Sequence, residues 1–336
     1  MHVKKTRIPL VAAAVALVAV VALLLAPTPL RSRVQATALD PAGAAPAGTP
    51  PAGTAPHGTT SATAPAGSPP PTATPGSTAA DPGGTAADPG RTGDDARLPG
   101  ATQPGALPPV VDHGPRTGGK VALTFDADMT DAMRRQLRGP NPPSYANLAI
   151  VELLERQQVP ATFFLTGKWV REYPELTRRL AGNPRFELAN HTYGHAAFTS
   201  DCYHLTPLPR REMTADVART FDVIAPYGGR QTRYFRFPGL CHDRTALTEL
   251  APLGLTVVDG DVVSGDPFAK YWQPIVRAVL SQVRPGSVII LHVTEANAPM
   301  TDEALPHILA GLAERGLEPA PLSEVLGDPA RVASRS

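Results

Sequence analysis

The feature that most constrains this chain is a long stretch, residues 35–119, that cannot contribute to a hydrophobic core. It is dominated by Pro, Ala, Gly and Thr, with repeats such as Pro-Ala-Gly-Thr and Ala-Ala-Asp-Pro-Gly and hardly any aromatic residue. A segment of this composition cannot bury enough apolar surface to offset its chain entropy, so we predict a disordered linker. It is either a flexible tether or a wall-binding or glycosylated stalk. One folded domain is therefore expected at residues 120–327, followed by a C-terminal tail at 328–336.

The N-terminal segment, residues 1–34, is predicted to be a signal peptide or a membrane anchor. Lys4, Lys5 and Arg7 precede an apolar run at residues 8–26 that is close to the roughly 20 residues needed to span a bilayer. A retained anchor is favoured because no clear cleavage site follows the run directly. Basic residues before the run place that end in the cytoplasm, so we expect the folded domain at the extracellular face of the membrane or secreted to the cell wall.

Charge and cysteine content narrow the range of partners. With 31 Lys and Arg against 30 Asp and Glu, the net charge is +1, so the chain has no excess of positive charge with which to bind a nucleic acid. The protein is expected to be a monomer.

Cys202 and Cys241 both lie in the exported part, where a disulfide is favoured over free thiols. A structural zinc site that includes His204 and His242 is the alternative.

Apolar runs of strand length alternate with segments of helical period throughout the predicted domain. The expected strands are residues 120–126, 161–166, 186–189, 234–237, 255–258 and 287–291, with a weaker seventh at 317–322. The expected helices are residues 145–158, 168–180, 210–224, 246–253, 272–283 and 303–315. This alternation predicts an α/β fold with a parallel sheet covered by helices, either doubly wound or closed as a barrel.

Polar residues lie at or just after the ends of the expected strands. They are Asp126, His191, Arg236, Asp261 and His292. The carboxyl ends of parallel strands meet at one edge, where the active sites of both architectures are built. The clustering of these residues therefore predicts a functional site.

His191 and His195 form the most specific local pair, because their spacing can bring both imidazoles to one side of a turn. Imidazole nitrogens suit Zn²⁺ and similar ions, and a carboxylate is the natural third ligand of a catalytic site. Asp126 and Asp128 are both candidates, able to divide ligation and proton transfer between them. Two histidines at this spacing can also be merely solvated or hydrogen-bonded.

Two further residues stand in apolar surroundings. His292 is either a buried core residue or an acid that faces the cleft. Arg236 is flanked by apolar residues, and a buried guanidinium requires a carboxylate partner, for which Asp266 and Asp261 are the candidates.

Five short motifs in this order resemble those of the polysaccharide deacetylases of NodB-homology type, carbohydrate esterase family 4, over residues 121–326. Thr124-Phe125-Asp126 matches the start of Thr-Phe-Asp-Asp-Gly, and residues 191–195 match His-Ser/Thr-x-x-His fully. Residues 236–238 match Arg-x-Pro, with Gly239 in place of the aromatic residue. Residues 261–267 approximate Asp-x-x-Asp-Trp, with Asp266 as the second Asp and Pro267 in place of Trp. Leu291-His292 resembles the fifth motif, Leu-x-His, in shifted form.

The resemblance implies a distorted (β/α) barrel of about seven strands and a role for each matching residue. Asp126 would be the general base, His292 the general acid, and Arg236 with Asp266 would orient the base. His191 and His195 would bind the metal, Zn²⁺ in the first place and Co²⁺ as the alternative.

Ala127 departs from the first motif, whose second Asp is a metal ligand. Asp128 is the candidate replacement. Because adjacent strand residues face opposite sides, the loop is expected to curl for Asp128 to reach the ion.

The implied reaction is hydrolysis of the acetamide of N-acetylated sugar residues in a polysaccharide, peptidoglycan or chitin-like, with release of acetate. Two alternatives remain: hydrolysis of a small non-sugar amide on the same fold, and a degenerate sugar-binding module without turnover.

Overall fold

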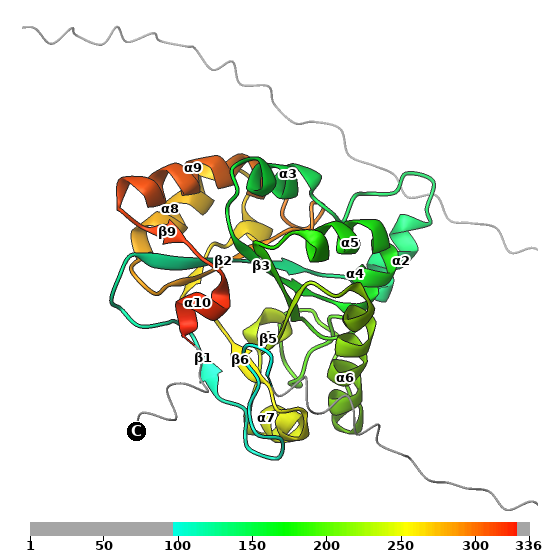
Figure 1. The fold of residues 1–336 in the computed structure, drawn as a ribbon. Helices are drawn as coiled ribbons and strands as arrows, with labels where there is room; N and C mark the ends of the chain where they lie inside the picture. The colour runs from blue at the N-terminus through cyan, green and yellow to red at the C-terminus, as the bar shows by residue number, and fades with distance from the viewer. Residues whose placement is uncertain (1–96, 328–336) are drawn as a thin grey trace, which may run out of the picture. The chain divides into compact units, whose positions relative to one another are not determined.

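The computed structural model describes residues 97–327, which form an α/β domain (Figure 1). The predicted signal or anchor segment, the linker up to residue 96 and the C-terminal tail lie outside the described residues. Within residues 97–327, no helix is long and apolar enough to cross a bilayer.

The strands form one parallel sheet that curls into a partial barrel, which confirms the predicted fold class. Its order is β1-β6-β5-β4-β3-β2-β8-β7, and β9 pairs with β2. The strands are β1 (Val110–Val111), β2 (Lys120–Ala127), β3 (Ala161–Leu165), β4 (Phe186–Asn190), β5 (Arg230–Phe235), β6 (Thr256–Val258), β7 (Val262–Val263), β8 (Val288–His292) and β9 (Glu318–Pro319). The edge strands β1 and β7 were not predicted, because two residues are too few to display a periodic pattern.

Helices surround the strands (Figure 1). They are α2 (Asp131–Leu137), α3 (Leu148–Arg156), α4 (Gly167–Glu172), α5 (Pro174–Gly182), α6 (Met213–Ile224), α7 (Arg244–Leu250), α8 (Trp272–Gln282), α9 (Thr301–Glu314) and α10 (Leu322–Leu326). The single helix expected at residues 168–180 is in fact α4 and α5. Pro174 disfavours helical geometry at the residue before it, and Tyr173 accordingly adopts φ −123° and ψ 58°.

Strand side chains alternate between two apolar layers. Phe125, Phe163 and Leu291 face outward, into the core beneath the helices. Phe164, Tyr234 and their inward-facing neighbours pack instead in a second cluster with Leu322 and Val325 of α10.

Helix α10 covers the amino-terminal end of the barrel. The backbone N–H of Leu322 donates to Thr162 Oγ1, and that of Ser323 donates to the buried carboxylate of Glu187, both near the starts of their strands. The apolar side chains of α10 and of the inward-facing strand residues fill this end of the interior. The residues predicted for the functional site lie toward the opposite, carboxyl-terminal end of the strands.

The boundary predicted at residue 120 needs correction, because residues 97–119 contact the domain. Thr102 N–H donates to the carbonyl of Gly254, and β1 pairs with β6. Arg116 forms an ion pair with Asp261 at 2.7 Å. The composition of residues 97–119 does not indicate that they belong to the domain, because backbone pairing requires neither a hydrophobic period nor a particular side chain.

Candidate active site

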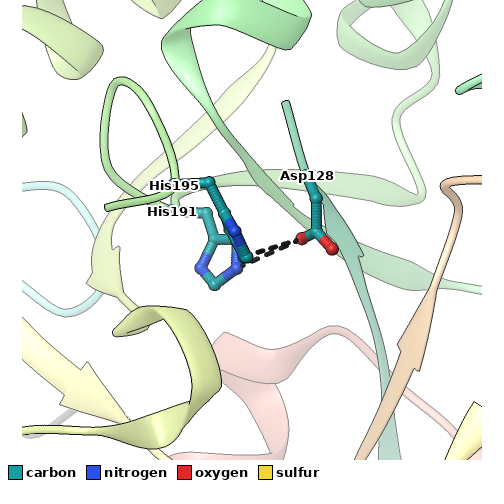
Figure 2. A group of neighbouring side chains, drawn as sticks. All are labelled: Asp128, His191 and His195. Carbon is teal, nitrogen blue, oxygen red and sulfur yellow. Dashed lines mark ion pairs between the residues drawn. The ribbon is translucent and has the colours of Figure 1, made fainter. Parts of the chain in front are cut away.

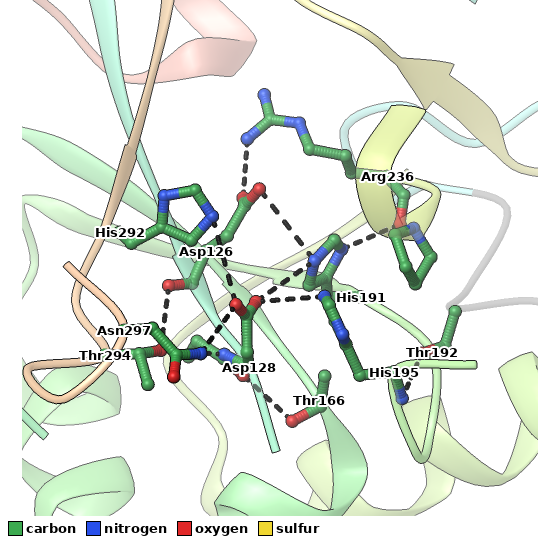
Figure 3. A network of polar contacts seen from close by, with 12 residues as sticks. Asp126, Asp128, Thr166, His191, Thr192, His195, Arg236, His292, Thr294 and Asn297 are labelled. Carbon is green, nitrogen blue, oxygen red and sulfur yellow. Dashed lines mark hydrogen bonds and ion pairs between the residues drawn. The ribbon is translucent and has the colours of Figure 1, made fainter. Parts of the chain in front are cut away.

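Three of the five polar residues predicted at the strand ends, Asp126, His191 and His292, line one cavity of about 210 Å³, and Asp261 does not. Its lining includes Asp126, Asp128, His191, His195, Asp266 and His292. Arg236 is fully buried beside Asp126 (Figure 3). The structure thus brings together the seven residues proposed as catalytic or metal-binding, and it leaves Asp261 outside the site.

Asp128, His191 and His195 form the central cluster (Figure 2). Oδ1 of Asp128 is 3.5 Å from Nε2 of His191 and 3.2 Å from Nε2 of His195. One ligand atom from each residue lies within 4.8 Å of the other two. No donor among the described residues hydrogen-bonds to this buried Oδ1, so it is an acceptor without a partner.

Asp128 reaches the cluster by strand alternation, so the curled loop expected from the sequence is not needed. Asp128 directly follows β2 and continues its alternation, so it faces the same cavity as Asp126, two residues earlier. Ala127 faces the opposite way and is fully buried with Phe125 and Met129 in the outer core.

A compact turn after β4 orients the two histidines. The backbone N–H of Thr192 donates to Asn190 Oδ1, and that of His195 donates to Thr192 Oγ1. Thr192 and His195 both adopt a positive φ, 71° and 56°. Nδ1 of His191 lies 2.8 Å from the carbonyl oxygen of Arg236 and donates to it, which leaves Nε2 to face Asp128.

The electrostatics of the cluster favour an ionised Asp128. Burial by itself would raise the pKa of this carboxyl group. The charges of His195 and His292 and the close approach of the His191 and His195 imidazoles outweigh burial, so the pKa lies well below its usual value.

These three residues fit a divalent cation. Bonds of about 2.0–2.1 Å in a tetrahedral site place ligand atoms roughly 3.4 Å apart, close to the separations between Asp128 and the histidines. The unpartnered Oδ1 and the fixed Nε2 of His191 are the donor atoms that such an ion requires. Asp128, His191 and His195 would hold it.

Arg236 pairs with Asp126, and this corrects the partner predicted from the sequence. Its Nη1 donates to Asp126 Oδ1 at 2.7 Å, and its Nε donates to the carbonyl of Val258. Asp261, one predicted partner, binds Arg116 instead. Asp266, the other, lies after β7 and beside the end of β8, whereas Arg236 follows β5.

Asp266 supports His292, and the predicted role in orienting the base is therefore wrong. Its carboxylate accepts hydrogen bonds from Nδ1 and the backbone N–H of His292, at 2.9 and 2.7 Å. Ser264 and Thr301 donate to it as well. Burial would lower the pKa of His292, but the charges of Asp266 and Asp128 outweigh it and raise the pKa to about 10. His292 is therefore protonated at neutral pH.

Residues after β8 that were not predicted also contact Asp128 (Figure 3). Thr294 Oγ1 accepts from the backbone N–H of Asp128 at 2.9 Å, and Asn297 Nδ2 donates to its Oδ2 at 3.3 Å. The signal available in the sequence was the presence of Thr294, Glu295 and Asn297 shortly after the expected strand end at His292.

The predicted disulfide between Cys202 and Cys241 is present, with 5.9 Å between the two Cα atoms. The alternative of a structural zinc site at these cysteines is therefore wrong. The bridge joins the loop after β4 to the segment after β5.

Together the fold and the site define a hydrolase of the parallel α/β barrel type. The polysaccharide deacetylase family profile matches residues 113–258. A chitooligosaccharide deacetylase from Sinorhizobium fredii is 31% identical over 218 residues, 60% of this chain and 91% of that protein. The chain belongs to the polysaccharide deacetylase family.

Two solved structures share the fold at lower identity. A peptidoglycan N-acetylglucosamine deacetylase superposes with a TM-score of 0.54 at 24% identity, covering 65% of this chain and 92% of that one. A Bacillus anthracis pseudoenzyme of carbohydrate esterase family 4 gives 0.54 at 21% identity, covering 66% and 70%.

Proposed function

We propose that this protein is a metal-dependent deacetylase that hydrolyses the acetamide of N-acetylated sugar residues in a polysaccharide. The observation that carries the proposal is the arrangement of Asp126, His292 and the Asp128 cluster around one cavity. A carboxyl group to act as the base, a protonated histidine and a divalent cation site are the groups that amide hydrolysis requires.

The metal would supply what an acetamide lacks, because a bound cation polarises the carbonyl oxygen and lowers the pKa of water. Asp126 takes the proton from the attacking water. Its ion pair with Arg236 fixes the orientation of the carboxylate, leaving Oδ2 for this task. His292, held by Asp266, donates a proton to the departing amine. The products are acetate and a free amino sugar.

The relatives support the substrate class, and the cluster of Asp128, His191 and His195 supports the metal dependence. Chitooligosaccharide deacetylases are among the relatives, and a peptidoglycan deacetylase shares the fold. We therefore propose peptidoglycan or chitin-like chains as substrates and Zn²⁺, or alternatively Co²⁺, as the ion. The disulfide supports an exported protein, because such bonds persist in oxidising compartments.

The direct test is acetate release from N-acetylglucosamine oligomers and from peptidoglycan by the full chain supplied with Zn²⁺ or Co²⁺. Asp126→Asn should lower kcat by about 10²–10⁴-fold, because it removes the base and leaves the cavity intact. Asp112→Asn is the matched control, since Asp112 is exposed and does not line the cavity. Chelation should abolish release, and added metal should restore it. The absence of acetate from both substrates with metal present would refute the proposal.

A sugar-binding module without turnover is the second candidate, and Ala127 in place of the motif's Asp favours it. The pseudoenzyme with a similar fold provides a precedent. Binding of oligomers without acetate release would select this candidate. Release of acetate from small acetamides alone would select the non-sugar amidase.

A further inference from the structure

Two exposed aromatic side chains stand at the mouth of the cavity. Tyr203 and Phe268 are 67% and 77% exposed, and both line the cavity that contains Asp126 and Asp128. Their ring centroids are 6.4 Å apart, with 30° between the ring planes. They come from different loops, Tyr203 from the one after β4 and Phe268 from the 3₁₀ helix after β7.

Folding alone gives no reason for this pair. An exposed aromatic ring buries little of its apolar surface, so it contributes little to the core. Tyr203 also adopts φ +52°, a left-handed conformation that disfavours bulky residues and would suit Gly or Asn better. A strained, exposed aromatic residue at a cavity mouth indicates a binding role.

The two aromatic residues lie beside the two positions at which the chain departs from aromatic residues of the resembled motifs. A Cβ added to Gly239 would lie 2.9 Å from the ring of Tyr203 and 2.9 Å from the sulfur of Cys202. Tyr203 therefore occupies the space that a side chain at position 239 would take. Phe268 directly follows Pro267, which stands where the motif has Trp.

The disulfide fixes the loop that carries Tyr203. Cys202 is 4% exposed and is bridged to Cys241, next to the segment that contains Gly239. The Tyr203 ring is thereby restrained at the rim. Restraint of this kind reduces the entropy lost when a ligand binds.

We propose that Tyr203 and Phe268 form a platform on which a second pyranose ring stacks, adjacent to the sugar that enters the cavity. This proposal rests on the proposed function, and it assigns the substrate as an oligosaccharide or polysaccharide chain rather than a single sugar. Asp126 and Asp128 are only 4% and 5% exposed, so the reacting group must enter the cavity while the rim remains free for the neighbouring ring. The apolar C–H face of a pyranose matches an uncharged aromatic surface.

The test compares binding of the N-acetylglucosamine pentamer and monomer to the full chain by isothermal titration calorimetry. Tyr203→Ala and Phe268→Ala should each weaken pentamer binding by about 5–10-fold and reduce the preference for pentamer over monomer. Tyr203→Phe should retain pentamer binding within about twofold, because stacking needs only the ring. Tyr271→Ala is the matched control: Tyr271 is 68% exposed, does not line the cavity and makes no cap hydrogen bond.

The outcomes separate the platform from the reaction. If the wild-type chain releases acetate and both alanine variants bind the pentamer as it does, the platform is refuted while the proposed function stands. If it binds the pentamer without releasing acetate and the variants lose binding, the platform stands and the reaction fails. Failure of the wild-type chain to bind the pentamer would overturn the platform.

Discussion

Asp128 is the residue on which the candidate metal centre depends. Its Oδ1 is buried, close to two imidazoles and without a hydrogen-bond donor among the described residues. A buried acceptor left in this state is costly unless another species satisfies it. Ala127, at the position of the motif's second Asp, is turned into the outer core and cannot be replaced by an acid without burying a charge.

The first prediction concerns metal affinity. Asp128→Ala should weaken Zn²⁺ or Co²⁺ binding by more than about 100-fold, because loss of a residue that only orients a ligand already costs about 10–100-fold. Competition with a chromophoric chelator measures this affinity. Asp112→Ala, which removes an exposed carboxylate, should leave it unchanged.

The complementary change, Ala127→Asp, tests the orientation of this strand. It should not restore metal binding to the Asp128→Ala variant, and it should lower the free energy of unfolding by about 3 kcal/mol or more through an unpaired buried charge. Restored metal affinity in the double variant would contradict the assignment of faces along β2.

At the residue scale, the sequence predicts local relations well and distant ones poorly. His191 and His195 are close in the sequence, so the position of both imidazoles on one side of a turn could be predicted. The partners of Arg236 and Asp266 depend on which strands lie side by side. That order is set by tertiary packing, which the sequence of one strand does not contain.

At the scale of elements, a clear apolar run decides what could be predicted. The short β6 was predicted nearly to its bounds, whereas β5, which begins Arg-Gln-Thr-Arg, was predicted to begin four residues late. Strands β2, β3, β4 and β8 have at least five residues and a clear apolar pattern, and they were predicted nearly to their bounds. Helix α10 was missed because its five residues make little more than one turn. It nevertheless covers the inward-facing apolar residues at the amino-terminal end of the barrel.

This role of α10 predicts that shortening one of its buried side chains has a large effect on the free energy of unfolding. Leu322 is fully buried, so Leu322→Ala should lower the free energy of unfolding by about 2–5 kcal/mol. Leu148→Ala is the matched control, because Leu148 is 49% exposed and also begins a helix; its effect should be within about 0.5 kcal/mol. Denaturant unfolding measures both. Equal losses for the two variants would contradict the closing role of α10.

At the scale of the whole molecule, contacts distant in sequence join loops at both ends of the strands. At the site edge, the disulfide joins residues separated by 39 positions. At the opposite end, Arg116 pairs with Asp261, whose carboxylate also accepts from the backbone N–H of Val288 at the start of β8. The cavity wall that carries Cys202 is therefore held by a covalent bond in addition to the sheet.

Reduction of the disulfide should destabilise the domain by about 3–4 kcal/mol, the value expected for a closed loop of this length. Guanidinium unfolding of the oxidised chain, the reduced chain and the Cys202→Ser/Cys241→Ser double variant measures the loss. Reductant should have no effect on the double variant, which serves as the control. An unchanged unfolding midpoint in the reduced wild-type chain would refute the prediction.

The alternation that begins in β2 has a consequence for how such a site is recognised in a sequence. Asp126 and Asp128 are two residues apart, so both carboxylates face the interior, while Ala127 between them belongs to the core. A search pattern that requires two adjacent Asp residues rejects this chain, whereas a pattern that allows one residue between them accepts it.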